Sequence, residues 1–210
     1  MVELFMMTIE EAKKLPQSFA ELHFPERLAK AKSFAFESDY LRSIGAGYLL
    51  YSILGLESKD IYYKENGKPL SEKTDKGFNL SHSGDYIILA TGEGAIGADI
   101  EKLGEYKSGV AKRIFTDEEL AYISEAPEER FYLLWSLKES ASKAIGKGIN
   151  FDFKLFNALP LLHGKAIKID NAELFGKAFI YNGYSVAVCS QRTVRKIKMQ
   201  KIEISAHEKC

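Results

Sequence analysis

The sequence predicts an α+β fold of two similarly organised lobes, each with helices packed on an antiparallel sheet. Amphipathic helical patterns followed by short strands and tight turns occur twice along the 210 residues, which indicates a pseudo-twofold arrangement. A polar, glycine-containing stretch at 102–108 separates the two series. We therefore expect an N-terminal lobe at residues 1–104 and a C-terminal lobe at residues 105–210.

The composition is that of an ordinary globular protein and argues against two classes of partner. Lys and Arg together number 29, as do Asp and Glu, so the whole chain exerts no strong field on nucleic acid or on a membrane surface. No apolar segment approaches the roughly 20 residues that span a bilayer, and the first residues lack the pattern of a signal peptide. Two cysteines, Cys189 and Cys210, make no disulfide framework, so we expect a cytoplasmic protein.

The N-terminal third is predicted to contain a strand and two helices. Residues 1–9 alternate loosely between apolar and polar side chains, which favours a strand. Pro25 suits the first turn of a helix that extends to about residue 34. A second helix begins at Ser38, a plausible N-cap, and ends near Gly55. The exposed side of the first helix carries three basic residues, Arg27, Lys30 and Lys32.

Arg42 lies in the first turn of this second predicted helix. The positive end of the helix dipole disfavours a cation there, although a bound anion would offset the cost.

A β-meander is predicted further along the chain, with strands at 78–80, 86–91 and 95–101 and a turn at 81–85. His82 lies in that turn, where a histidine often only makes local hydrogen bonds.

The longest predicted helix runs from Pro127 to about Gly146. Trp135, Glu139 and Lys143 stack at i, i+4 and i+8 along the edge of its broad apolar arc. A surface pair that stabilises the helix by about 0.2–0.5 kcal/mol is one interpretation of the glutamate and the lysine. Trp135 is expected to pack and so to fix the helix.

The strand at 95–101 places Gly97, Asp99 and Glu101 on one face. Two carboxylates on one face repel each other unless a cation lies between them or solvent screens them. Hard oxygen ligands without His or Cys favour Mg²⁺ over zinc, and Gly97 would leave room for a ligand. An acidic strand end that simply reaches solvent is the alternative.

Glu139 is a candidate third carboxylate, and Lys143 is a candidate partner for phosphate oxygens. Mg²⁺ usually binds a few carboxylates and completes its shell with water and substrate phosphates. The chain offers these acids but no evident nucleophile. This combination favours phosphoryl transfer, in which positioning and charge neutralisation make up most of the catalysis.

Residues 96–102 (Ile-Gly-Ala-Asp-Ile-Glu-Lys) and 135–143 (Trp-Ser-Leu-Lys-Glu-Ser-Ala-Ser-Lys) resemble the two-part signature of the 4′-phosphopantetheinyl transferases. Length and two-lobed organisation resemble the monomeric surfactin-synthetase-activator class rather than the short trimeric class devoted to fatty-acid carrier proteins. Ala98 departs from the family pattern, in which a bulkier apolar residue is common, but it faces away from the acids. Four further matching blocks run in family order, at 67–69, 78–84, 111–115 and 146–148.

The resemblance implies a reaction and a place for it. Coenzyme A binds between the lobes, a serine hydroxyl of an apo acyl or peptidyl carrier protein attacks the β-phosphate, and 3′,5′-ADP leaves. The nucleophile belongs to the partner, which would explain why the chain shows no catalytic triad. The carriers of this family serve fatty-acid, polyketide or nonribosomal-peptide biosynthesis.

The resemblance also implies roles for individual residues. Asp99, Glu101 and Glu139 would hold Mg²⁺, and Lys143 would stabilise the oxygens of the pyrophosphate. The implied catalytic residues are therefore Glu139, Lys143 and Asp99. The implied contacts of the coenzyme A phosphates are Arg42, at the 3′-phosphate, together with Lys68, His82 and Lys143.

Several roles stay open in the sequence. The serine proton goes to Glu139, directly or through water, or to Glu119, whose place in a capping box already gives it a structural task. Lys138, inside the apolar arc, either extends along the helix toward solvent or reaches into the site. Lys30 and Lys32 either assist the 3′-phosphate or form a solvated helix face.

Two other functions compete with the transferase. A non-catalytic module that binds coenzyme A or a carrier protein would not need all three acids. A Mg²⁺-dependent hydrolase of the coenzyme A pyrophosphate would use water in place of the serine. The glutamate-rich helical box typical of the main such hydrolases is absent from the sequence.

Overall fold

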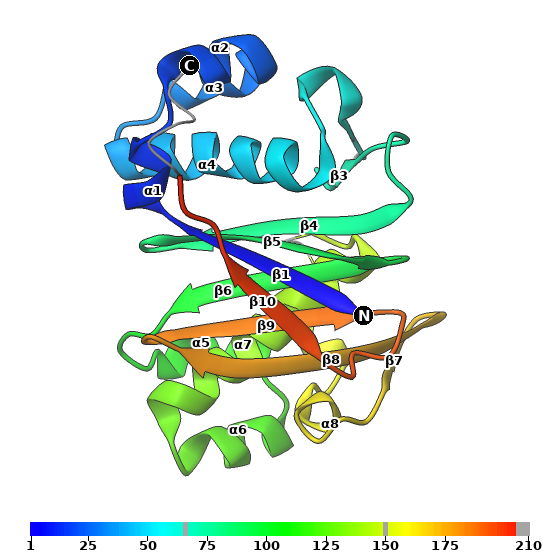
Figure 1. The fold of residues 1–210 in the computed structure, drawn as a ribbon. Coiled ribbons are helices and arrows are strands. Elements are labelled where there is room, and N and C mark those ends of the chain that lie inside the picture. Colours follow the sequence, from blue (N-terminus) through cyan, green and yellow to red (C-terminus); the bar gives the residue numbers. More distant parts are fainter. Residues whose placement is uncertain (65–66, 149–150, 205–210) are drawn as a thin grey trace.

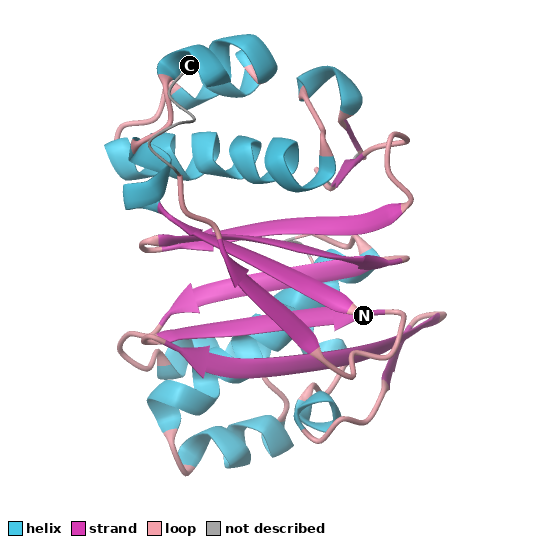
Figure 2. Cartoon of the chain, in the orientation of Figure 1, coloured by secondary structure: helices cyan, strands magenta, loops and turns pink. Residues whose placement is uncertain are grey.

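The computed structural model describes residues 1–64, 67–148 and 151–204, with two stacked sheets in the middle and helices on both outer sides (Figures 1 and 2). The N-terminal half comprises β1 (Val2–Thr8), α1 (Ile9–Lys13), α2 (Gln17–His23), α3 (Pro25–Ala31), α4 (Glu37–Leu54), a 3₁₀ helix (Ser58–Asp60), β2 (Tyr62–Tyr63), β3 (Pro69–Leu70), β4 (Lys76–Ser83) and β5 (Tyr86–Glu93). The remainder comprises β6 (Ile96–Lys102), α5 (Ser108–Ile114), α6 (Asp117–Ser124), α7 (Pro127–Ile145), a 3₁₀ helix (Phe153–Leu155), α8 (Leu159–Leu162), β7 (Ile167–Ile169), β8 (Ala172–Tyr181), β9 (Tyr184–Ser190) and β10 (Ile197–Lys201).

The strands form two four-stranded sheets, β10-β1-β5-β4 and β6-β9-β8-β7, and a short ribbon, β2-β3. The second sheet is antiparallel, as predicted. The first sheet contains one parallel pair, because β10 runs alongside β1 from Val2↔Ile197 to Met6↔Lys201. The prediction of a fully antiparallel first sheet is therefore wrong for its last strand.

Two strands pair with a sheet on the other side of the predicted division at residues 104/105. β6 precedes it and pairs with β9 of the second sheet, whereas β10 follows it and joins the first sheet. The mixed composition, with helices packed on largely antiparallel sheets, agrees with the sequence. The exact division and the pseudo-twofold relation stay predictions.

Apolar side chains form one layer between the sheets and one under each set of helices. On β1, Leu4 lies between the sheets, and Phe5 packs with the N-terminal helices. On β9, Val188 lies between the sheets, and Cys189 packs in the layer of α7. The period of two along each strand thus lets each sheet bury both of its faces.

The N-terminal helices differ in detail from the prediction. α4 begins at Glu37 after Phe36, so Ser38 lies inside the helix and is not its N-cap. Arg42 consequently lies in the second turn, where Ser38 Oγ accepts a hydrogen bond from its Nη2 at 3.0 Å. Gly55 ends the helix with a φ of 66°, which glycine adopts without strain.

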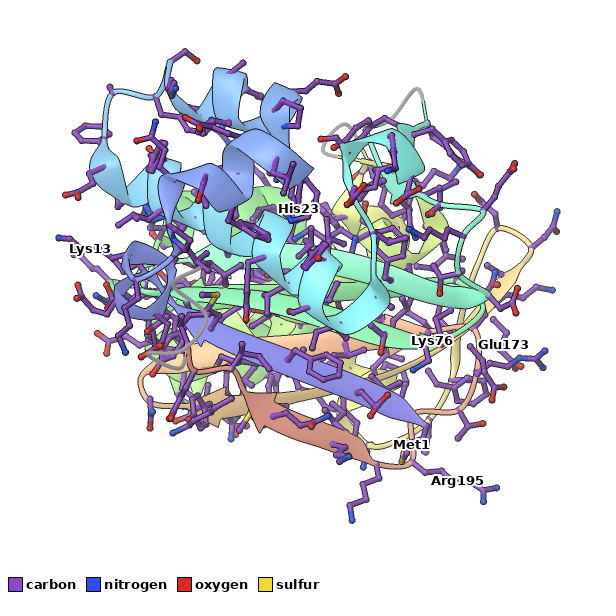
Figure 3. All side chains as sticks on the ribbon, turned by 45° about the horizontal axis from the view of Figure 1, so that its top comes forward. Met1, Lys13, His23, Lys76, Glu173 and Arg195 are labelled. Atoms are coloured by element: carbon purple, nitrogen blue, oxygen red, sulfur yellow. The ribbon has the colours of Figure 1, made fainter. Side chains whose placement is uncertain are left out.

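α2 is tied to the segment that follows α4 by His23, labelled in Figure 3, whose Nδ1 lies 2.9 Å from Glu57 Oε1. β4 extends to Ser83, so His82 lies in a strand and not in the predicted turn. α7 has the predicted start and ends before Gly146, whose φ is 71°. Among the described residues, no helix is both long and apolar enough to cross a membrane.

A fully buried ion pair joins α6 to α7. Lys138 Nζ lies 2.9 Å from Glu119 Oε2, and both side chains have no exposed surface. The same amine donates to the carbonyls of Phe153 and Phe156 at 2.7 and 2.6 Å. Lys138 therefore does not extend to solvent, and its amine anchors the chain after α7 through these bonds.

Removing one member of this pair should destabilise the fold. Glu119→Gln leaves a buried lysine charge without its counterion, so we expect a loss of about 3–5 kcal/mol in the free energy of unfolding. Urea denaturation measures the change. The exposed neighbour Glu118 is the matched control, and Glu118→Gln should stay within about 0.5 kcal/mol of the wild type. An unchanged free energy in Glu119→Gln would contradict the structural role.

Candidate active site

Gly97 brings β6 directly against α7. A Cβ atom at this position would lie 2.0 Å from Ser140 O and 2.4 Å from Ala144 N, which no side chain can tolerate. The expectation that Gly97 leaves room for a ligand is therefore wrong, because the backbone of α7 fills that space. The close approach sets Asp99 and Glu101, the next residues on this face, beside the edge of α7.

Asp99 is almost fully buried at the centre of the site, with 2% of its surface exposed. Its Oδ1 accepts hydrogen bonds from Lys143 Nζ at 2.6 Å and from Ser81 Oγ at 3.0 Å. Among the described residues, none donates a hydrogen bond to the buried Oδ2. A buried carboxylate oxygen without a donor is costly, and a bound cation would satisfy it.

Glu101 is held by two donors, one from β4 and one from α7. Ser83 Oγ donates to Oε2 at 3.1 Å, and Trp135 Nε1 donates to Oε1 at 3.2 Å. Burial, and next the charge of Asp99, raise the pKa of Glu101 above its ordinary value. The indole therefore does more than pack, because it also orients one of the acids.

Glu139 completes the acidic group from α7, one turn before Lys143. Burial raises the pKa of Glu139, Lys143 opposes this rise, and the charges of Asp99 and Glu101 add to it. Carboxylates with raised pKa values that share a cavity are a frequent property of functional sites.

A cavity of about 370 Å³ collects these side chains. The walls come from five elements, namely α3, α4, β4, β6 and α7. Asp99, Glu101, Glu139 and Lys143 thus meet as the sequence predicted, and His82 joins them. The lining consists of Arg27, Ala46, Leu80, Ser81, His82, Asp99, Glu101, Glu139 and Lys143.

The donor set fits a divalent cation. Three carboxylates face one cavity, and the buried Oδ2 of Asp99 lacks a donor among the described residues. In residues 1–64, 67–148 and 151–204, no three acidic, His or Cys side chains are already placed to coordinate one ion. Instead, the ammonium group of Lys143 forms an ion pair with Asp99.

A larger groove of about 710 Å³ adjoins this cavity and shares Arg27, Ala46 and His82 with it. Arg27 and Lys30 supply positive charge, and aromatic side chains come from the residue before α3, the loop after it and β2. The wall consists of Phe24, Glu26, Arg27, Lys30, Phe34, Asp39, Ser43, Ala46, Ser58, Ile61, Tyr63, Gly67 and His82. Cationic and aromatic groups together suit a phosphorylated ring compound.

Arg42 and His82 lie close together between α4 and β4. Arg42 Nη1 donates to Gly84 O at 3.2 Å, and Nη2 forms an ion pair with Asp39 at 3.3 Å. Burial, followed by the charges of Arg42 and Lys143, lowers the pKa of His82. His82 is therefore largely neutral at neutral pH, and the positive charges around it favour an anion.

Two predicted residues do not line the cavity that the acids share, namely Arg42, described above, and Lys68. Lys68 Nζ donates to the carbonyls of Lys143, Ala144 and Ile96 at 2.7, 3.0 and 3.1 Å. It lines a separate cavity of about 660 Å³ at the C-terminal end of α7. The structure thus places this amine on backbone oxygens.

Arg27 is the residue that the sequence analysis missed, since it was treated as part of an exposed helix side. It lines both the cavity and the groove, whereas Lys30 lines the groove alone. The spacing of three between them on a helix was a usable signal, because i and i+3 share a face. Glu119 lies elsewhere, buried with Lys138, and is excluded as the base.

Comparisons with known proteins identify the family of this chain. A family model for the 4′-phosphopantetheinyl transferase superfamily matches residues 95–189. The 4′-phosphopantetheinyl transferase Sfp of Bacillus subtilis (strain 168) is 31% identical over 190 residues, which cover 83% of this chain and 84% of Sfp. The transferase psf-1 of Bacillus pumilus is also 31% identical, over 80% of this chain and 78% of its own.

A solved structure, the holo-[acyl-carrier-protein] synthase of Thermotoga maritima, matches 45% of this chain and 61% of its own. Its TM-score of 0.33 and identity of 16% are too low to support an argument about the fold. The extent of the match to Sfp is what decides the class. This chain belongs to the 4′-phosphopantetheinyl transferase family, in the class of the surfactin-synthetase activators.

Proposed function

We propose that this enzyme transfers the 4′-phosphopantetheine group of coenzyme A to a serine of an apo acyl or peptidyl carrier protein, with Mg²⁺, and releases 3′,5′-ADP. The observation that carries the proposal is the cavity in which Asp99, Glu101, Glu139 and Lys143 meet. It adjoins a groove with cationic and aromatic walls. Family membership supports the same reaction.

The groove is the proposed site of the nucleotide of coenzyme A. Arg27 and Lys30 would neutralise phosphate groups. Arg42, the proposed contact of the 3′-phosphate, lies beside the groove through its ion pair with Asp39, which is part of the groove wall. Phe34 and Tyr63 offer aromatic surface for the adenine ring. The pyrophosphate would then lie toward His82 and Lys143, because these residues line the cavity that adjoins the groove.

Asp99, Glu101 and Glu139 are the proposed Mg²⁺ ligands. When bound, the ion neutralises charge on the pyrophosphate oxygens. Lys143 stabilises the same oxygens, and its present bond to Asp99 shows that its amine reaches the cavity. Ser83 and Trp135 keep the Glu101 carboxylate oriented, which limits the rearrangement that binding requires.

The chemical step uses a nucleophile from the partner. The carrier serine oxygen forms a bond to the β-phosphorus, the bond from that phosphorus to the bridging oxygen breaks, and 3′,5′-ADP leaves with that oxygen. Glu139 accepts the serine proton, directly or through one water. Its raised pKa suits this role, since a more basic carboxylate is a better proton acceptor.

We further propose a cytoplasmic monomer without nucleic-acid or membrane partners. All proposed ligands and cations come from this one chain, so the site needs no second copy. Net charge is zero and the described free cysteine, Cys189, is buried. The carriers would be those of fatty-acid, polyketide or nonribosomal-peptide biosynthesis.

A carrier modification assay tests the reaction directly. The protein is mixed with coenzyme A, Mg²⁺ and several apo carrier proteins, and each carrier is weighed by mass spectrometry. We expect each substrate carrier to gain the mass of one phosphopantetheine group, and to gain none when EDTA is present from the start to chelate the metal. Cleavage of coenzyme A without a carrier would favour the hydrolase, and binding without any chemistry would favour the non-catalytic module.

Glu139→Gln should separate function from stability. Because the pKa of Glu139 is raised, the folded state binds more protons than the unfolded chain, and stability falls as pH rises through that pKa. The ionised carboxylate thus destabilises the fold at neutral pH. We expect an equal or higher Tm at pH 7 with transfer reduced about 100-fold or more.

The matched control for this variant is Glu128→Gln, an exposed glutamate in the first turn of the same helix. It should keep full transfer activity. Asp99→Ala, in contrast to this control, should abolish transfer while the variant still unfolds cooperatively. A clear fall in Tm for Glu139→Gln would indicate that this acid stabilises the fold instead.

Arg27→Met tests the groove. Loss of a charged contact to phosphate should raise the KM for coenzyme A about tenfold and leave the KM for the carrier unchanged. Lys32→Met, on the same helical segment but outside the groove, serves as the comparison. Equal KM values for coenzyme A in both variants would place the nucleotide elsewhere.

A further inference from the structure

Lys68 connects three parts of the molecule that the proposed reaction uses. It follows Gly67, which lines the groove. Its amine donates to Ile96 O at the start of β6, the strand of Asp99 and Glu101. It also donates to the carbonyls of Lys143 and Ala144 in the last turn of α7.

The chemistry of a helix end explains this contact. The last four carbonyls of a helix have no intrahelical donor, and a cation there is favoured by the helix dipole. Burial, with a smaller effect from Lys64, lowers the pKa of Lys68 to about 8. The amine is thus still mostly protonated at neutral pH, and it donates to these three carbonyls.

Both the backbone and the side chain of Lys143 are held in place by hydrogen bonds. Lys68 fixes its backbone carbonyl, while its own amine reaches Asp99 at 2.6 Å. A phosphate contact by Lys68 would break the carbonyl bonds that fix the end of α7. The amine therefore suits a clamp on the backbone better than a ligand contact.

We propose that Lys68 is a positioning residue for the transfer, fixing the end of α7 against β6 and so setting the place of Lys143. This inference rests on the proposed function. It assigns the residue an effect on the rate of transfer and no direct part in binding coenzyme A. Through Gly67, the same segment also joins the groove wall to the helix that carries the site.

The experiment compares Lys68→Met, Lys68→Arg and, as a control for local charge, Lys64→Met. Steady-state kinetics give kcat and the KM for coenzyme A at saturating carrier, and calorimetry gives the Kd of coenzyme A. Amide hydrogen exchange follows peptides that cover residues 140–147. For Lys68→Met we expect kcat to fall about tenfold, KM and Kd to stay within about twofold, and exchange at 143–147 to rise.

Lys68→Arg keeps charged donors and should recover part of kcat, and Lys64→Met should match the wild type. A tenfold rise in KM and Kd with kcat unchanged would overturn the proposal, because it would identify a phosphate contact. Unchanged kcat and unchanged exchange would overturn it as well. If Lys68→Met does not fold, Lys68→Gln replaces it. Failure of the wild type to modify any carrier would reject the reaction, whereas exchange at 143–147 would still test the clamp.

Discussion

The contact of β6 with α7 at Gly97 is the constraint on which the site depends. With a Cβ atom 2.0 Å from Ser140 O, any other residue would push the strand and helix apart. Asp99, two residues on, would then lose the amine of Lys143. A residue without a side chain thus determines whether the charged residues of two separate elements share one cavity. The atoms in this contact belong to the backbone of α7, so a side-chain rearrangement cannot make room for a larger residue.

Polar side chains of β4 also hold β6, the last strand of its sheet, although the two strands belong to different sheets. Asn79 Oδ1 accepts from the backbone N–H of Ala98 at 2.8 Å. Ser81 donates to Asp99, and Ser83 donates to Glu101. These residues alternate along the strand, so they share one face. The first sheet thereby fixes the acids that the second sheet carries, and the site exists only where both meet.

Much of the site could be predicted from the sequence, and the predictions that were wrong have physical causes. Asp99, Glu101, Glu139 and Lys143 converge as predicted, because strand and helix periodicity fix which residues share a face. Lys68 went to a different place because a helix end competes for a cation, and that competition is invisible before α7 and β6 are packed. The parallel pairing of β10 with β1, residues almost the whole chain apart, likewise depends on tertiary contacts that no local pattern encodes.

The site carries its charge at the expense of local stability. Burial raises the pKa values of Glu101 and Glu139, and Oδ2 of Asp99 has no donor among the described residues. The rest of the fold must hold these groups in place, through the buried pair of Lys138 with Glu119 and through the three apolar layers. A cation bound among the acids would reduce the repulsion between them and would satisfy the free oxygen of Asp99. Because such a cation binds only the folded state, its addition should raise the free energy of unfolding. The strain of the free site would therefore favour the binding of a positively charged ligand.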